Sequence, residues 1–218
     1  MTYRSVFLPI LLLGLAGSGV VQAKETVPQK FALPTASTAM TLRFSERQWR
    51  DLVFDVAHNN RFDILKSLSG QALDFRMRDE TGYTLLMVAA GYTGTEKGSF
   101  NPEMIDYLIA HGAEPCARTD KGNTALMVAA GSDNVPAIER LAKAGCAIDE
   151  ANMSGKTALI YAASGGQDGA VRKLLSLGAD PLIKGKTGYT ARSYALYGQH
   201  ENIAAILEEA EKKYSLKK

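Results

Sequence analysis

The residues whose types and spacing could support chemistry are two cysteines and two Gly-Lys-Thr tripeptides. The tripeptides, Gly155-Lys156-Thr157 and Gly185-Lys186-Thr187, match the closing half of a phosphate-binding loop. The complete loop needs another glycine five residues before the glycine that precedes the lysine, and those positions hold Glu150 and Asp180. Neither tripeptide follows the pattern of a buried strand. We therefore discount nucleotide binding and attribute both tripeptides to the repeats described below.

Cys116 and Cys146 are the only cysteines among the 218 residues. Two thiols are too few for a four-thiolate zinc site or for a disulfide-dense scaffold. Three interpretations stay open: a disulfide, two buried thiols that act as small apolar residues, or a reactive pair that responds to oxidants. A disulfide requires the two Cα atoms to lie within about 7 Å, which sequence spacing alone does not establish.

Other catalytic and metal-binding patterns are missing from the sequence. The histidines His58, His111 and His200 have no partner at i+4 and no cysteine at ligand spacing, so we expect no metal and no other cofactor. No Gly-x-Ser-x-Gly elbow occurs, and the acidic residues form no recognisable acid–base pair. We therefore expect a protein that is not an enzyme and takes no small-molecule substrate.

The composition is that of an ordinary folded protein. Hydrophobic residues make up 46% of the chain and charged residues 22%, which argues against intrinsic disorder. The 25 Lys and Arg residues against 23 Asp and Glu residues give a formal charge of +2. Because nucleic-acid binding usually requires a strongly basic surface, this balance points away from a nucleic-acid partner.

The first 23 residues have the pattern of a cleaved secretory signal peptide. Arg4 gives a basic start, and residues 6–16 (VFLPILLLGLA) form a short apolar stretch. Val21 and Ala23 place small residues where a signal peptidase reads the chain. The apolar stretch is shorter than the about 20 residues that span a bilayer. We expect cleavage after Ala23, no stable membrane anchor, and a periplasmic product if the source is a Gram-negative bacterium.

A repeated pattern organises the rest of the chain. Four segments of the form Gly-x-Thr, whose glycines are 40, 33 and 33 residues apart, each precede a short apolar helix pattern. A second apolar helix follows, and in three units it ends in a glycine turn. The threonines can cap the first helices, and paired alanines let neighbouring helices approach closely. First helices are expected at 85–90, 125–130, 158–163 and 191–196, and second helices at 104–109, 138–141, 171–177 and 203–207.

In these segments the chain resembles the ankyrin repeat family, whose pattern runs D-x-x-G-x-T-P-L-H-x-A-A, then a second helix, then G-A-D. The glycine and threonine of the pattern match at Gly82 and Thr84, and they match again in each later unit. The family's proline is replaced by leucine or alanine. The residues at the family's histidine position are Met87, Met127, Ile160 and Ser193. The resemblance implies an all-α solenoid of helix-turn-helix units with hairpin fingers.

The repeats also set the expected boundaries along the chain. Residues 45–78, with a Ser45–Gln48 capping box, are expected to form a degenerate N-terminal repeat that covers one end of the core. Residues 92–102, between the helices of the first full repeat, are expected to form a projecting loop. The expected segments are 1–23 signal peptide, 24–44 flexible linker, 45–78 N-terminal unit, 79–118, 119–151, 152–184 and 185–210 repeats, and 211–218 charged C-terminal tail.

The resemblance further implies a protein-binding module, because ankyrin stacks present a concave surface built from finger tips and first helices. Carried over by position, this surface includes four tyrosines, which supply large contact areas at low entropic cost. The candidate partner-binding residues are Glu80, Thr81, Tyr83, Tyr92, Asp120, Lys121, Asn123, Ser132, Met153, Ser154, Lys156, Ser164, Lys186, Thr187, Tyr189 and Tyr197.

Small exported ankyrin proteins suggest two roles for such a module. Some are immunity proteins that block a secreted toxin, and others accompany defences against oxidants. We expect a monomer that binds, inhibits or protects another exported protein. The alternative class of function is a redox response by Cys116 and Cys146. We expect these cysteines in loops of adjacent repeats at the same end of the stack.

Overall fold

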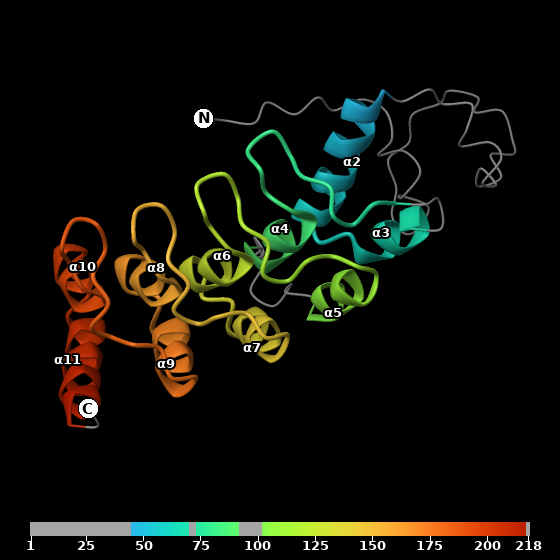
Figure 1. The fold of residues 1–218 in the computed structure, drawn as a ribbon. Helices are drawn as coiled ribbons and strands as arrows, with labels where there is room; N and C mark the ends of the chain where they lie inside the picture. Colours follow the sequence, from blue (N-terminus) through green and yellow to red (C-terminus); the bar gives the residue numbers. More distant parts are fainter. Residues whose placement is uncertain (1–44, 70–72, 92–101, 217–218) are drawn as a thin grey trace, which may run out of the picture.

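A computed structural model describes residues 45–69, 73–91 and 102–216. In this part of the chain ten α-helices form five pairs, and the pairs stack into one elongated array (Figure 1). The first helices are α2 (Glu46–His58), α4 (Leu85–Gly91), α6 (Ala125–Gly131), α8 (Ala158–Ser164) and α10 (Ala191–Tyr197). The second helices are α3 (Phe62–Ser69), α5 (Pro102–Ala110), α7 (Val135–Lys143), α9 (Asp168–Ser176) and α11 (Glu201–Ser215). The predicted all-α repeat solenoid is confirmed.

The predicted helices agree with the observed ones, with one exception at the C-terminal end. Each first helix from α4 onward ends one residue later than predicted, and each second helix begins two or three residues earlier. Each of these second helices has a polar residue or proline within its first two positions, which an apolar pattern leaves out. At that end α11 continues through the charged residues to Ser215, past residue 210, where the sequence analysis placed the start of the charged tail. None of the described helices combines the length and the apolar character needed to cross a membrane.

Side-chain caps lie at the starts of helices, and glycine turns follow the second helices, as predicted. Ser45 and Gln48 form the expected capping box at the start of α2. Each capping threonine accepts a hydrogen bond from the backbone N–H three residues later, at 3.2 to 3.4 Å. These threonines are Thr84, Thr124, Thr157 and Thr190. The glycines after the second helices, with φ between 90° and 95°, are Gly112, Gly145 and Gly178. Such left-handed backbone is adopted by glycine without strain.

The core lies where the first helices stack on one another. Gly91 shows how closely they approach, since a Cβ atom there would lie 2.6 Å from Cγ1 of Val128 in the next repeat. Each repeat adds a leucine from its second helix, and each of these leucines is fully buried. No unit buries its apolar face alone, so the units depend on their neighbours. The paired alanines, at most 4% exposed, are Ala89-Ala90, Ala129-Ala130 and Ala162-Ala163.

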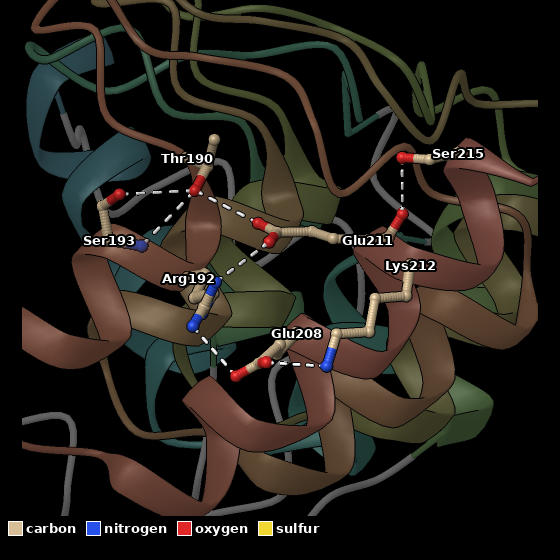
Figure 2. Close-up of polar contacts among 7 residues, drawn as sticks. All are labelled: Thr190, Arg192, Ser193, Glu208, Glu211, Lys212 and Ser215. Atoms are coloured by element: carbon tan, nitrogen blue, oxygen red, sulfur yellow. Dashed lines mark hydrogen bonds and ion pairs between the residues drawn. The ribbon is translucent and has the colours of Figure 1, made fainter.

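The last repeat closes the stack with polar residues. Arg192 occupies the repeat position that holds a buried leucine in the earlier units, and Ser193 takes the position of a buried methionine or isoleucine. Arg192 donates a hydrogen bond to Glu208 at 2.9 Å and lies 3.6 Å from Glu211 (Figure 2). Lys212 pairs with Glu208 at 2.8 Å. A further repeat would have to bury this network, so these charged residues close this end of the stack.

A disulfide joins Cys116 to Cys146, with the two Cα atoms 5.2 Å apart. It connects the loops that follow the second helices of two adjacent repeats. Cys116 is exposed, whereas Cys146 is only 8% exposed. Of the three interpretations that the sequence leaves open, the structure contains the disulfide.

The residues equivalent to Cys116 in the two neighbouring repeats also form a bond to the loop of the following repeat. One repeat earlier, Arg76 donates a hydrogen bond to the carbonyl of Gly112 at 3.4 Å. One repeat later, the Asp149 carboxylate accepts a hydrogen bond from the backbone N–H of Asp180 at 3.0 Å. At this one repeat position, successive loops are therefore connected by an arginine hydrogen bond, a disulfide and a carboxylate hydrogen bond. This series assigns the disulfide a structural role.

Removing the disulfide should destabilise the stack. Replacing Cys116 and Cys146 by serine releases a constraint on the unfolded chain across a sequence separation of 30 residues. Loop-closure entropy assigns such a constraint about 3 to 4 kcal/mol. Urea unfolding followed by circular dichroism measures the change, and wild-type protein kept in reductant should match the double variant. A loss under about 1 kcal/mol would show that the link contributes little.

Candidate functional site

Hairpin fingers project from the stack ahead of α4, α6, α8 and α10, and they point the same way (Figure 1). The first residue of each finger donates a backbone hydrogen bond to the carbonyl of the residue four positions later, at 2.9 to 3.1 Å. A glycine with φ between 71° and 81° makes the turn in each finger. The residue pairs that close the fingers are Asp79–Tyr83, Thr119–Asn123, Asn152–Lys156 and Gly185–Tyr189.

The fingers hold their shape without the histidine of the ankyrin pattern. In the first three fingers, the side chain of the first residue accepts a hydrogen bond from the backbone N–H four positions later, at 2.9 to 3.0 Å. The residues at the histidine position in these repeats are buried in the core. In these repeats the hydrogen bonds that close each finger are therefore formed by residues of the finger itself. The accepting side chains are Asp79, Thr119 and Asn152.

Neighbouring fingers are also hydrogen-bonded to each other. The backbone N–H of Met153 donates to the carbonyl of Lys121 at 3.0 Å, and that of Lys186 donates to the carbonyl of Ser154 at 2.9 Å. A Cβ atom on Gly155 would lie 2.9 Å from the Lys186 nitrogen, so this close approach requires glycine. The tips of the last three fingers are thus held at fixed distances from one another.

The floor of this face is a row of equivalent residues on the first helices. Each residue lies four positions after a capping threonine and is half-buried. In the last two repeats the position holds Tyr161 and Tyr194, so the floor becomes aromatic there. Both tyrosines fit the apolar helix pattern in the sequence, so neither was predicted as a site residue. Their 33-residue spacing was the signal that the sequence offered. The row is Val88, Val128, Tyr161 and Tyr194.

Tyr161 ties its helix to two fingers. Its hydroxyl donates to Oδ1 of Asn123 at 3.1 Å and accepts from Nδ2 of Asn152 at 3.0 Å. Asn152 Nδ2 also donates to Asn123 Oδ1 at 2.8 Å. Burial raises the pKa of the Tyr161 phenol, and the neighbouring Tyr83 adds to the rise. The phenol therefore stays protonated at neutral pH and keeps its role as a donor.

A second cluster surrounds Tyr194. The Nζ atom of Lys156 lies 4.6 Å from the centre of the Tyr194 ring and 6.0 Å from that of Tyr161, which are cation–π distances. The ring of Tyr189 meets that of Tyr194 edge-on, with the centres 6.0 Å apart. The Thr187 hydroxyl lies 2.9 Å from the Tyr194 hydroxyl. The Lys156 ammonium is thus held over an aromatic surface between two fingers.

Part of the predicted binding set converges on these two clusters. Asn123 belongs to the first cluster, and Lys156, Thr187 and Tyr189 belong to the second. Tyr83 is half-buried and close enough to Tyr161 to influence its pKa. The predicted residues exposed on the finger tips are Asp120, Lys121, Met153, Ser154 and Lys186.

Other predicted residues lie elsewhere or are engaged within the chain. Glu80 forms an ion pair with Arg47 of α2 at 2.8 Å. The Thr81 hydroxyl donates a hydrogen bond within its own finger. Tyr92 lies outside the described residues, as does the predicted loop apart from its last residue. The predicted residues at or beside the C-terminal ends of first helices are Ser132, Ser164 and Tyr197, and Tyr197 is 93% exposed.

The arrangement offers contacts for recognition. Its surface combines aromatic rings, an ammonium group and hydroxyl groups on a rigid backbone edge. Within the part of the chain that the structure describes, no three His, Cys, Asp or Glu side chains come together as metal ligands.

The hydroxyl of Tyr161 should contribute measurably to stability. Tyr161→Phe keeps the ring but leaves the Asn123 and Asn152 amides without one partner, which should cost about 1 kcal/mol of unfolding free energy. Tyr194→Phe is the matched control, because its hydroxyl bonds the exposed Thr187 and should cost under about 0.5 kcal/mol. Urea unfolding measures both variants, and equal costs would contradict the assignment.

Comparison with known proteins agrees with the repeat pattern. A family model described as "Ankyrin repeats (3 copies)" matches residues 52–149 and 95–185. Together these ranges cover more than half of the chain, from α2 to the start of the fourth finger. A search of curated proteins found none that matches the chain.

Proposed function

Since the chain belongs to the ankyrin repeat family, whose repeats generally mediate protein–protein binding, we propose that it is a non-catalytic module that binds another protein. The binding surface is the face formed by the fingers and the first helices. The observation that carries this proposal is the cluster of Lys156, Tyr189 and Tyr194, in which Tyr189 is 58% exposed. Rigid aromatic side chains bury large areas on binding and lose little entropy.

Preorganisation of this face supports the proposal. Backbone hydrogen bonds connect the second finger to the third and the third to the fourth. A surface whose parts are already fixed loses less conformational freedom when a partner docks. No catalytic function and no cofactor are part of this proposal.

The partner in this proposal is another exported protein. The leader pattern that ends at Ala23 supports export of this chain. The disulfide supports it too, because disulfides persist in oxidising compartments such as the periplasm. In that compartment the module, as a monomer, binds its partner and inhibits or protects it. Gene order distinguishes the two roles: a neighbouring secreted lipase or nuclease favours immunity to a toxin, and a neighbouring catalase favours defence against oxidants.

Redox sensing by Cys116 and Cys146 is the alternative class. The equivalence of Cys116 to Arg76 and Asp149, which also connect neighbouring loops, favours a structural disulfide over a sensor. The serine double variant separates these roles. If the double variant retains its partner as well as the oxidised wild-type chain does, and reductant does not change retention by the wild-type chain, the redox alternative is removed.

The binding face is tested by comparing two exposed apolar residues on different sides of the stack. Tyr189→Ala lies on the finger face, and Leu177→Ala lies beyond the end of the second helix α9. Immobilised mature chain is incubated with a periplasmic extract of the source organism, and the retained protein is quantified. We expect Tyr189→Ala to lower retention by about tenfold, since truncating an aromatic contact residue costs more than about 1 kcal/mol, while Leu177→Ala leaves it unchanged. Equal losses for both variants, or no retained protein at all, would contradict the proposal.

A further inference from the structure

Two cations on the second-helix side of the stack pair with acids of the preceding repeat. Arg140 of α7 contacts Asp106 of α5 at 3.0 Å. Lys173 of α9 contacts Glu139 of α7 at 2.5 Å, and its hydrogen bond lowers the pKa of that carboxyl group. The same arrangement, an acid on one helix and a base on the next, thus occurs in two successive interfaces. These four charged side chains therefore compensate one another.

The fingers of the third and fourth repeats are different. Residues 151–164 and 182–198 contain four basic residues and no Asp or Glu. Arg192, one of the four, is occupied by the terminal ion-pair network. The other three, Lys156, Lys184 and Lys186, form no ion pair with any other described residue. A chain with nearly balanced total charge therefore concentrates positive potential on these two fingers.

The chemistry beside these lysines suits carboxylates. The Lys156 ammonium lies over the Tyr194 ring, and the backbone N–H of Lys186 donates to the third finger, so the two lysines come from adjacent, hydrogen-bonded fingers. The exposed hydroxyl groups of Ser154 and Thr187 lie on the same finger tips. Exposed rings and apolar side chains stand next to them, at Met153 and Tyr189.

We propose that this face of the third and fourth repeats binds an acidic polypeptide segment of the partner. Carboxylates of the segment contact Lys156 and Lys186, and its apolar side chains lie against Tyr189 and Met153. This inference rests on the proposed function and names the chemistry of the partner. Electrostatic complementarity of this kind speeds association and selects among partners.

An acidic peptide fits the surface better than nucleic acid does. Binding of a phosphate backbone usually draws on many basic residues along an extended path. Here the path is interrupted, because the first two fingers carry Asp79, Glu80 and Asp120 beside their basic residues. Lys156, Lys184 and Lys186 span two repeats only, which matches a short acidic segment.

The test measures binding of a defined probe to the mature chain. The probe is a fluorescein-labelled peptide of about 12 residues, alternating Asp or Glu with Leu or Gly, which spans about 40 Å when extended. A second peptide replaces every Asp and Glu by Asn and Gln. The double variant Lys156→Met with Lys186→Met removes two charges from the finger face. Lys143→Met with Lys213→Met is the matched control, because it removes two charges from exposed second-helix positions.

We expect the acidic peptide to bind the wild-type chain and the amide peptide to bind at least about tenfold more weakly, the difference that two solvent-exposed ion pairs produce. The finger variant should weaken binding of the acidic peptide by about tenfold, the control by less than about twofold, and added salt should weaken the wild-type complex. Equal binding of the two peptides, or equal losses in the two variants, would overturn the inference. A labelled single-stranded oligonucleotide that binds more tightly than the acidic peptide would overturn it as well and assign the surface to nucleic acid.

The two proposals can fail separately. The finger variant is therefore also tested for retention of the natural partner. If that partner is retained through Tyr189 but without dependence on Lys156 or Lys186, the acidic segment is rejected and the protein-binding function stands. If no partner is retained by any form of the chain, the function itself is rejected.

Discussion

Close packing of each first helix on the next is the interaction on which the rest of the structure depends. The paired alanines bring the helices near enough for the fingers of the last three repeats to share backbone hydrogen bonds. Those bonds place Lys186 beside the third finger and hold Lys156 over Tyr194. A larger residue in the helix stack would separate the fingers as well as the helices. The binding face is therefore a consequence of core packing.

The bonds that link neighbouring repeats occur at fixed repeat positions, but different types of side chain form them. At one position, arginine, cysteine and aspartate make successive connections between loops. At the start of the second helices, Asn134 Nδ2 donates to the carbonyl of Ala90 at 2.9 Å, and Gln167 Nε2 donates to that of Gly131 at 3.0 Å. In each case a side chain satisfies a backbone group at the end of a first helix in the preceding repeat. The geometry of the stack selects where a bond must form, and several side chains can form it.

This difference explains what the sequence could predict. Short-range signals were sufficient for the first helices, because a capping threonine such as Thr124 and a turn glycine such as Gly122 act on neighbouring residues. The site was harder to predict. Tyr161 sits within an apolar helix pattern, and only its hydrogen bonds to two fingers reveal its role. The ion pair of Glu80 with Arg47 depends on how α2 docks, and the disulfide depends on a distance between two loops. Such features follow from three-dimensional proximity and have no local signal.

The central claim is that the fingers and first helices of the later repeats form the binding face for a protein partner. Amide hydrogen exchange of the mature chain, alone and bound to its retained partner, tests this claim most directly because it reports protection along the whole backbone. If the later fingers bind the partner, exchange slows on binding within residues 153–161 and 186–194 and stays unchanged in α5, α7 and α9. Protection confined to the second helices, with the fingers unchanged, would contradict it.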